Sequence, residues 1–297
     1  MRRARSSASN PIRIRALIIE KQRATKVHTE VVLLCVYLLI DYFKKDGIIK
    51  IEPVRRIVMN TKKFDKKNTL VVAHRGLSGL ETENTNAAFV AAGNRSYYGI
   101  ETDIHRTLDG KFVVCHDDNL KRVGGENIPV EEVTVNTLLS TVLFDKDGTK
   151  NRADLRPTTL ENYISICKKY DKHSVLELKS QFTDEEIGRI VEIIDSLEYL
   201  ENVTFISFEY DNLVKLRRLL PKQSAQYLFS EVNEENFERA KAEHLDVDVY
   251  FKSLTEENVK AFHDAGMVVN CWTVNAIEDG ERLAEWGVDY ITTNILE

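Results

Sequence analysis

Residues 99–116 read GIETDIHRTLDGKFVVCH, and they contain two strand patterns joined by the tight turn Leu108-Asp109-Gly110. An Asp-Gly turn between two short strands is typical of an antiparallel hairpin. A parallel connection instead needs a crossover of about a dozen residues or more. The second strand pattern, residues 111–116, therefore stands apart from the other strands, and this separation decides how many parallel strands the chain has.

From Leu70 onward, short apolar strands alternate with helical stretches. The expected parallel strands are 70–74, 99–104, 174–179, 203–207, 225–229, 246–250, 268–274 and 288–292, and the expected helices are 84–95, 159–170, 184–199, 209–220, 233–242, 255–265 and 276–286. Eight such strands in about 230 residues predict an α/β fold, a (β/α)8 TIM barrel. The alternative, a doubly wound open sheet, should have a Gly-rich phosphate loop after its first strand, and none follows here.

We expect the barrel domain to span residues 68–297, with residues 117–157 as an insertion after the hairpin. This insertion fits neither a strand nor a barrel helix, apart from one expected helix near 134–141. Residues 1–58 form an extension outside the domain, with 13 basic and 5 acidic residues. Its apolar run Val31–Ile40 is shorter than the roughly 20 residues that span a bilayer. We interpret the extension as a translated leader, with Met59 as the natural start; the alternative is a peripheral amphipathic anchor.

Charge and cysteine content exclude several classes of protein. Residues 59–297 carry 28 basic and 42 acidic residues, which disfavours binding to nucleic acid. The four cysteines, Cys35, Cys115, Cys167 and Cys271, show no paired spacing, so neither a disulfide framework nor a cysteine zinc site is expected. We therefore expect a reducing, cytoplasmic location, with membrane association only through residues 1–58. Nothing in the sequence indicates a protein partner.

Three carboxylates are expected to meet at the mouth of the barrel. Glu101 and Asp103 are two residues apart on one strand, so their side chains share a face, and Glu177 lies on the next barrel strand. Because carboxylates buried together repel one another, a divalent cation is expected among them. Oxygen ligands favour Mg²⁺ or Ca²⁺ over zinc. The alternative is a set of salt bridges to Arg75, Lys179 or Arg106.

Two of the histidines end strands beside these carboxylates. His74 follows the first strand and His116 ends the hairpin, so the two imidazoles are candidates for general acid and general base. Arg75 and Lys179 are expected to bind a phosphate. The other histidines that we considered are expected to be structural; these are His105, His173, His244 and His263.

Five ordered motifs resemble those of the glycerophosphodiester phosphodiesterases. They are His74-Arg75-Gly76, Glu83-Asn84-Thr85, Glu101-Thr102-Asp103, His116-Asp117 and Glu177-Leu178-Lys179, followed by a late Trp272-Thr273-Val274-Asn275. The resemblance covers about residues 70–297. It departs at Thr82, where the family usually has proline, and at Asn294, where it usually has aspartate.

The resemblance implies metal-dependent hydrolysis of glycerophosphodiesters to sn-glycerol 3-phosphate and an alcohol. It also implies a role for each matching residue. Glu101, Asp103 and Glu177 are expected to bind Mg²⁺ or Ca²⁺, His74 and His116 to exchange protons, Arg75, Lys179 and Trp272 to bind the substrate, and Glu83 and Asn84 to support the first loop. Phe208 and Trp272 are candidates for the glycerol or alcohol pocket, or for plain core packing. The family's acid at position 294 has no counterpart in this sequence, where Asn294 stands.

Two other functions are compatible with the same residues. One is lysophospholipase D activity, which an apolar surface on residues 117–157 would favour; the charged stretch from Lys121-Arg122 to Glu131-Glu132 argues against it. The other is a barrel that binds phosphodiesters without hydrolysing them, which the presence of both histidines and all three carboxylates disfavours. The attacking group, water or the substrate's own hydroxyl, is not determined by the sequence.

Overall fold

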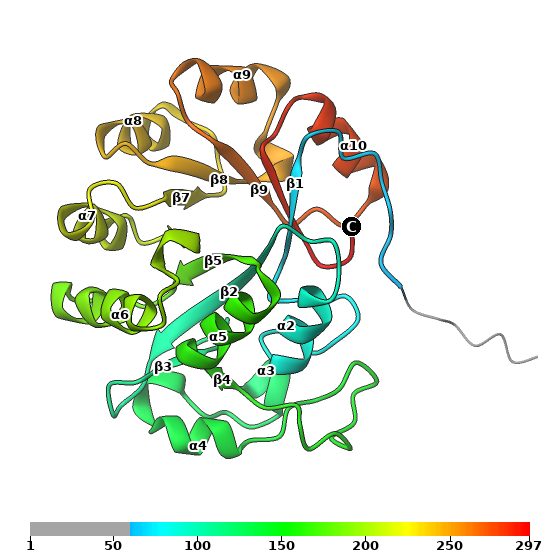
Figure 1. Cartoon of the computed structure of the whole chain (residues 1–297), viewed down its shortest axis with the longest axis vertical. Coiled ribbons are helices and arrows are strands. Elements are labelled where there is room, and N and C mark those ends of the chain that lie inside the picture. Colours follow the sequence, from blue (N-terminus) through cyan, green and yellow to red (C-terminus); the bar gives the residue numbers. More distant parts are fainter. Residues whose placement is uncertain (1–59) are drawn as a thin grey trace, which may run out of the picture. The chain divides into compact units, whose positions relative to one another are not determined.

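The computed structural model describes residues 60–297, so the expectations for residues 1–58 and for a start at Met59 lie outside the described residues. Eight parallel strands form a ring (Figure 1): β1 (Leu70–Ala73), β2 (Gly99–Arg106), β5 (His173–Leu178), β6 (Val203–Ser207), β7 (Ala225–Phe229), β8 (Asp246–Tyr250), β9 (Val269–Trp272) and β10 (Tyr290–Thr293). Neighbours in the chain pair with one another, and β1 pairs with both β10 and β2. The sheet is therefore closed, which confirms the TIM barrel.

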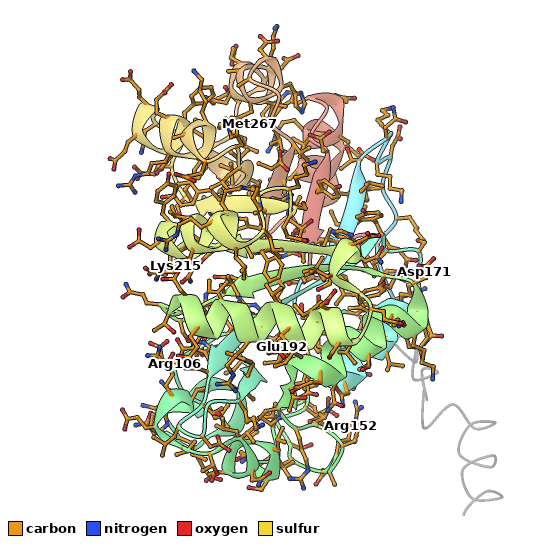
Figure 2. All side chains as sticks on the ribbon, turned by 60° about the vertical axis from the view of Figure 1, so that its left-hand side comes forward. Arg106, Arg152, Asp171, Glu192, Lys215 and Met267 are labelled. Atoms are coloured by element: carbon orange, nitrogen blue, oxygen red, sulfur yellow. The ribbon has the colours of Figure 1, made fainter. Side chains whose placement is uncertain are left out.

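Helices surround the ring and pack their apolar faces on it: α2 (Asn86–Gly93), α5 (Leu160–Tyr170), α6 (Asp184–Ser196), α7 (Tyr210–Leu219), α8 (Glu234–Ala242), α9 (Glu256–Asp264) and α10 (Ile277–Glu285). Helix α6 shows why they form. Thr183 and Glu186 cap its first turn reciprocally, and Ile190 and Ile194 are buried at helical spacing. Glu192 on the opposite face is exposed (Figure 2).

The hairpin and the insertion lie beside β2. Strand β3 (Phe112–Val114) is antiparallel to β2, as expected, and the two-residue strand β4 (Thr158–Thr159) extends this edge. Between them lie α3 (Lys121–Gly124), the 3₁₀ turn η1 (Val130–Glu132) and α4 (Val135–Ser140). They enclose an apolar cluster separate from the barrel core, made of Val113, Cys115, Leu120, Val130 and Leu138. The insertion therefore has a small core of its own.

The register of β2 and β5 places the polar positions at the mouth. Glu101 pairs with Val175, and Asp103 pairs with Glu177 two residues further along both strands. Alternate residues of a strand share a face, so all four point into the barrel. Val175 belongs to an apolar cluster with Val72, Ile206 and Leu228. The interior at this level also holds the buried polar residues Asp248 and Asn270, which are in register with Leu228. Glu101 lies level with Val175, and Asp103 and Glu177 lie two residues nearer the C-terminal ends of their strands.

A short segment before β1 runs beside the last residues of the chain. The backbone N–H of Lys62 donates to the carbonyl of Ile295, and that of Glu297 donates to the carbonyl of Lys62. The Glu297 carboxylate accepts from Thr61 Oγ1 at 2.6 Å, and from Ser96 N at 2.9 Å and Ser96 Oγ at 2.6 Å. In residues 60–297, no helix is long and apolar enough to cross a membrane.

Candidate active site

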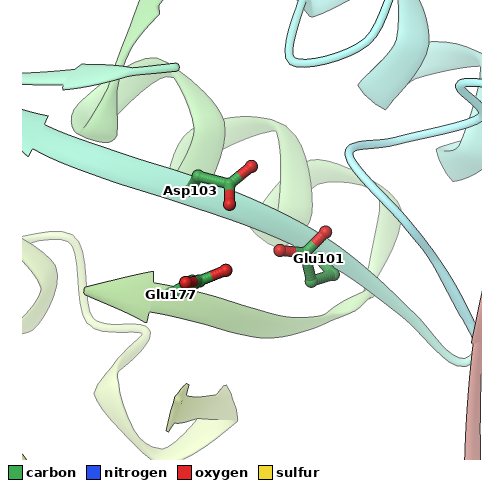
Figure 3. Close-up of side chains that lie close together, drawn as sticks. All are labelled: Glu101, Asp103 and Glu177. Atoms are coloured by element: carbon green, nitrogen blue, oxygen red, sulfur yellow. The ribbon is translucent and has the colours of Figure 1, made fainter. Parts of the chain in front are cut away.

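Glu101 and Asp103 on β2 and Glu177 on β5 converge at the mouth (Figure 3). One oxygen of each carboxylate lies within 4.8 Å of an oxygen of the other two. Their exposed fractions are 3%, 1% and 7%, so water screens their charges little. The grouping expected from the sequence is present.

Burial and mutual repulsion change the protonation of this cluster. Burial and the Asp103 charge raise the pKa of both Glu101 and Glu177. Burial opposes ionisation of Asp103 as well, but the Arg75 guanidinium keeps the pKa of Asp103 low. Asp103 Oδ1 is buried and has no hydrogen-bond partner among the described residues. Three carboxylates that each offer an oxygen, with Asp103 Oδ1 lacking a hydrogen-bond partner, fit a divalent cation such as Mg²⁺ or Ca²⁺.

Two cations face the carboxylates. Arg75 Nε lies 3.5 Å from Asp103 Oδ2, and Lys179 Nζ, directly after β5, lies 3.0 Å from Glu177 Oε1 and 3.9 Å from Asp103 Oδ1. Arg106, the third expected partner, instead pairs with Glu131 at 3.1 Å. Within residues 60–297, Arg75 Nε is buried without a hydrogen-bond partner, so a donor remains for an anion. Two of the three salt-bridge partners in the alternative interpretation are therefore present. Two cations do not balance the charge of three carboxylates.

His74 follows β1 and lies beside the cluster. Its Nε2 is 3.9 Å from Glu101 Oε2, and its Nδ1 is 2.7 Å from Asn294 Oδ1. Ser78 Oγ donates to the same amide oxygen at 2.9 Å. Burial and the Arg75 charge lower the pKa of His74 to about 4, so the ring is neutral near pH 7. Asn294, where the motif departs from the family pattern, therefore still orients His74.

The loop after β1 is held in an uncommon backbone conformation. Gly76 has φ +74°, and a Cβ there would lie 2.7 Å from Ala88, so only glycine fits. Arg75 and Asn84 also have positive φ, at 55° and 56°. The Arg75 N–H donates to Glu101 Oε2 at 2.8 Å, and Asn84 Nδ2 donates to Asp103 Oδ2 at 2.8 Å. These bonds hold the strained residues against the cluster.

His116 follows β3 at the end of the hairpin and is partly exposed. Its Nδ1 lies 2.7 Å from Asp117 Oδ1. Burial lowers the pKa of His116, although the nearby Asp103 charge opposes this effect. Of the four histidines expected to be structural, His105 contacts the His116 carbonyl at 3.3 Å, and His173 and His263 bond to Thr204 and Asp289.

Aromatic side chains line the other side of the mouth. Trp272 packs edge-on against Phe208 and at a tilt against Tyr250, with ring centroids 5.5 Å apart in both pairs. Phe208 is 42% exposed, while Trp272 also packs on the apolar cluster inside the barrel. Lys179 Nζ lies 5.9 Å from the Phe208 ring centroid. The positions of Phe208 and Trp272 are therefore compatible with both expected roles, lining a substrate pocket and packing in the core. Tyr250 is a third aromatic residue in this group, which the sequence did not indicate.

Sequence reasoning missed Arg122 in the insertion. Its guanidinium donates to both oxygens of Glu83, at 2.8 Å each, and to both oxygens of Asp117, at 2.8 and 3.1 Å. Glu83 also accepts from Arg75 at 2.9 Å. Arg122 lies on a four-residue helix whose N-terminus has no side-chain cap. The sequence therefore does not indicate this helix, and only the fold reveals that Arg122 reaches these two carboxylates.

Comparison with known proteins agrees with this geometry. The family model "Glycerophosphoryl diester phosphodiesterase family" matches residues 74–297. A glycerophosphodiester phosphodiesterase of Caldanaerobacter subterraneus subsp. tengcongensis is 30% identical over 231 residues, covering 76% of this chain and 94% of that protein. One from Bacillus subtilis is 27% identical over 249 residues, covering 76% and 83%.

A solved structure shows the same architecture. An Oleispira antarctica phosphodiesterase in complex with the product sn-glycerol-3-phosphate has a TM-score of 0.71 and 25% identity, covering 78% of this chain and 96% of that one. The match of the family model extends over most of the chain, from His74 at the end of the first strand to Glu297. The chain therefore belongs to the glycerophosphoryl diester phosphodiesterase family.

Proposed function

We propose that this protein hydrolyses glycerophosphodiesters to sn-glycerol 3-phosphate and an alcohol with the help of one divalent cation, Mg²⁺ or Ca²⁺. The observation that carries the proposal is the buried trio of Glu101, Asp103 and Glu177, which faces Arg75 and Lys179 at the barrel mouth. Relatives that carry this activity in their names support it, as does the product complex of the Oleispira antarctica protein.

The three carboxylates would hold the cation. When bound, such an ion polarises a phosphoryl oxygen and stabilises the negative charge that develops during displacement at phosphorus. The donor set fits this role because all three ligands are oxygen atoms and Asp103 Oδ1 lacks a hydrogen-bond partner among the described residues.

The remaining residues bind the phosphate and move protons. Arg75 has a buried N–H without a hydrogen-bond partner among the described residues, and Lys179 has an ammonium beside the carboxylates, so both are placed to orient the phosphate. Of His74 and His116, one imidazole takes the proton of the attacking hydroxyl and the other gives a proton to the leaving alkoxide. Trp272 would line the side of the pocket opposite the carboxylates.

A reducing, cytoplasmic location remains part of this proposal. Within residues 60–297, Cys115, Cys167 and Cys271 are free and buried, which suits a compartment where thiols stay reduced.

The test is turnover of glycerophosphocholine by the protein after dialysis against EDTA, with and without added Mg²⁺, Mn²⁺ or Ca²⁺. We expect chelation to abolish release of sn-glycerol 3-phosphate and each added cation to restore it in part or in full. Glu177→Gln should weaken metal binding while the fold is kept, and the exposed Glu192→Gln serves as the matched control. Full activity of the chelated protein would contradict the metal assignment.

The same assay separates the two alternatives. Lysophosphatidylcholine hydrolysed far faster than glycerophosphocholine would indicate a lysophospholipase D. Binding of glycerophosphocholine by calorimetry without any release of product, with every cation present, would indicate a non-catalytic barrel.

A further inference from the structure

Arg122 joins two carboxylates that belong to different parts of the site. Asp117 is the neighbour and hydrogen-bond partner of His116 at the end of the hairpin. Glu83 lies in the loop before α2 and accepts from Arg75, which borders the metal cluster. The guanidinium of Arg122 lies between them and donates to both oxygens of each. The arrangement is a chain of contacts from His116 to Arg75 that runs through the insertion.

The fold brings Arg122 to this position by packing its neighbours. Leu120 is buried in the apolar cluster of the insertion, and Val123 packs on that cluster. Gly125 ends α3 with φ +76°, where a Cβ would lie 2.8 Å from the Phe144 ring. Because both sides of the helix are fixed in this way, the Arg122 side chain is directed away from the cluster and toward the barrel mouth.

The chemistry of these contacts fixes the proton on His116. A carboxylate without a proton can only accept a hydrogen bond. Hydrogen bonds from Arg122, against the effect of burial, lower the pKa of Asp117 to about 2, so this carboxylate is ionised at neutral pH. Nδ1 of His116 must then carry the proton that lies between it and Asp117 Oδ1, and in the neutral ring Nε2 is the nitrogen free to accept a proton.

We propose that Arg122 is a positioning residue, which fixes the orientation and tautomer of His116 by clamping Asp117 against Glu83. This inference rests on the proposed function, because it assigns His116 a proton-transfer role. Arg122 itself contacts neither of the two expected phosphate ligands nor any of the three metal-ligand candidates among the described contacts. Its effect on His116 is therefore transmitted through Asp117, while its other carboxylate partner, Glu83, contacts Arg75.

A planar guanidinium is required for this arrangement. Its N–H groups form a rigid fork that can serve two carboxylates at once, whereas an ammonium is a single point charge. Arg122→Lys therefore keeps the charge but cannot hold both Asp117 and Glu83 in the same geometry. Arg122→Gln removes the charge and most of the donors.

The first test is steady-state kinetics on glycerophosphocholine with the metal-loaded protein. We expect Arg122→Gln to lower kcat by about 10- to 100-fold, the range found when an orienting partner is removed, with little change in KM. Arg122→Lys should fall between this variant and the wild type. The matched control is Arg156→Gln, which loses the same charge within the insertion; among residues 60–297, Arg156 bonds only to the backbone carbonyls of Leu139, Ser140 and Ala153.

The second test is a double-mutant cycle with Asp117→Asn. If Arg122 acts through Asp117, Asp117→Asn alone should lower kcat by a similar factor, and adding Arg122→Gln to it should cause little further loss. Because Asp117→Asn leaves α3 unchanged, this variant still tests the inference if Arg122→Gln fails to fold by circular dichroism.

The third test does not depend on activity. The ¹⁵N chemical shifts of the His116 ring report which nitrogen carries the proton. The wild type and Arg156→Gln should show the Nδ1–H tautomer, and Arg122→Gln should show a mixture of both tautomers. If the wild type turned over no glycerophosphodiester, the proposed function would fail while this measurement still tested the positioning role.

Three results would overturn the inference. They are wild-type kcat in folded Arg122→Gln, equal activity of Arg122→Lys and the wild type, and an unchanged His116 tautomer in Arg122→Gln. A loss of kcat in Arg156→Gln as large as that in Arg122→Gln would show a general effect of the insertion and would equally reject a specific role for Arg122.

Discussion

Replacing Glu101 by glutamine should stabilise the metal-free protein. The Glu101 carboxylate lies within 4.8 Å of two other carboxylates, and in the described part of the chain its one hydrogen bond comes from the Arg75 N–H. Two unit charges at 4.8 Å repel by about 3.5 kcal/mol at an effective dielectric constant of 20. Proton uptake already relieves part of this repulsion, since the pKa of Glu101 is raised by burial and by Asp103. The glutamine oxygen can still accept from Arg75, so we expect a gain of about 2 kcal/mol.

The assay is thermal unfolding in EDTA and again with saturating Mg²⁺ or Ca²⁺. For a domain of this size, about 2 kcal/mol raises Tm by roughly 4–8 °C. In EDTA, Glu101→Gln should therefore melt above the wild type. Added cation should raise the Tm of the wild type, because a ligand at a hundred times its Kd contributes about 2.7 kcal/mol, but should raise that of the variant much less.

Glu177→Gln is the matched comparison. Glu177 is paired with Lys179 at 3.0 Å, so its removal loses an attractive contact along with the repulsive ones. We expect a smaller gain in EDTA than for Glu101→Gln. If Glu101→Gln melted below the wild type in EDTA, repulsion would not dominate the cluster. Equal stabilisation of variant and wild type by the cation would exclude Glu101 as a ligand.

Three further predictions concern proton transfer, substrate range and acid stability. His74→Ala and His116→Ala should each lower kcat by about 10²–10⁴-fold, and the double variant should lose far less than the product of the two single losses. The control is His263→Ala, which should keep near wild-type activity because His263 pairs with Asp289 away from the carboxylates. Glycerophosphocholine and glycerophosphoethanolamine should differ in kcat/KM by less than about tenfold, or about 1.4 kcal/mol. A preference of several orders of magnitude would contradict weak selectivity for the alcohol part of the substrate. Glu297→Gln should cost about 2 kcal/mol at pH 7, judged from urea unfolding, because the carboxylate accepts several hydrogen bonds.

The sign of the Glu297 effect with pH follows from its contacts. Burial would raise the pKa of Glu297, but hydrogen bonds from Ser96 and Thr61 outweigh it and lower the pKa to about 2. The unfolded chain has the ordinary value of 4.5. A depressed folded-state pKa stabilises the fold above pH 4.5, and this stabilisation is lost as the pH falls toward 2. The difference between Glu297→Gln and the wild type should therefore shrink over that interval, and a constant difference would contradict the account.

The periodic parts of the fold could be predicted from the sequence because most barrel strands are short, largely apolar runs, and they alternate with amphipathic helices such as α6, which has a capping box. The hairpin was equally clear, since Asp109-Gly110 permits a tight turn. The strand Thr158–Thr159 could not be predicted, because two residues carry no periodicity and pair only once β3 is in place. The helix expected to start at residue 84 starts instead at Asn86, because Asn84 has φ 56° and bonds to Asp103.

The grouping of Glu101, Asp103 and Glu177 could be predicted, because barrel geometry brings polar positions of neighbouring strands together at one end of the barrel. Arg122 and Asn294 lay beyond this reasoning for different reasons. Arg122 reaches the mouth from an irregular insertion, whose path depends on the packing of its own apolar cluster. Asn294 departs from the family pattern, but its bond to His74 needs only an acceptor oxygen, and the amide of asparagine supplies one as the carboxylate of aspartate would.

The separate apolar cluster of the insertion has a consequence for local unfolding. It contains five buried residues, compared with the much larger core between the barrel and its helices. A region with so few buried contacts opens at a lower free energy than the whole domain. Backbone amides of residues 118–140 should therefore exchange with solvent deuterium earlier than those of β2 and β5. His116 lies where the hairpin enters this region, so each opening would release its ring, and the lifetime of the closed insertion would limit how long the site stays assembled.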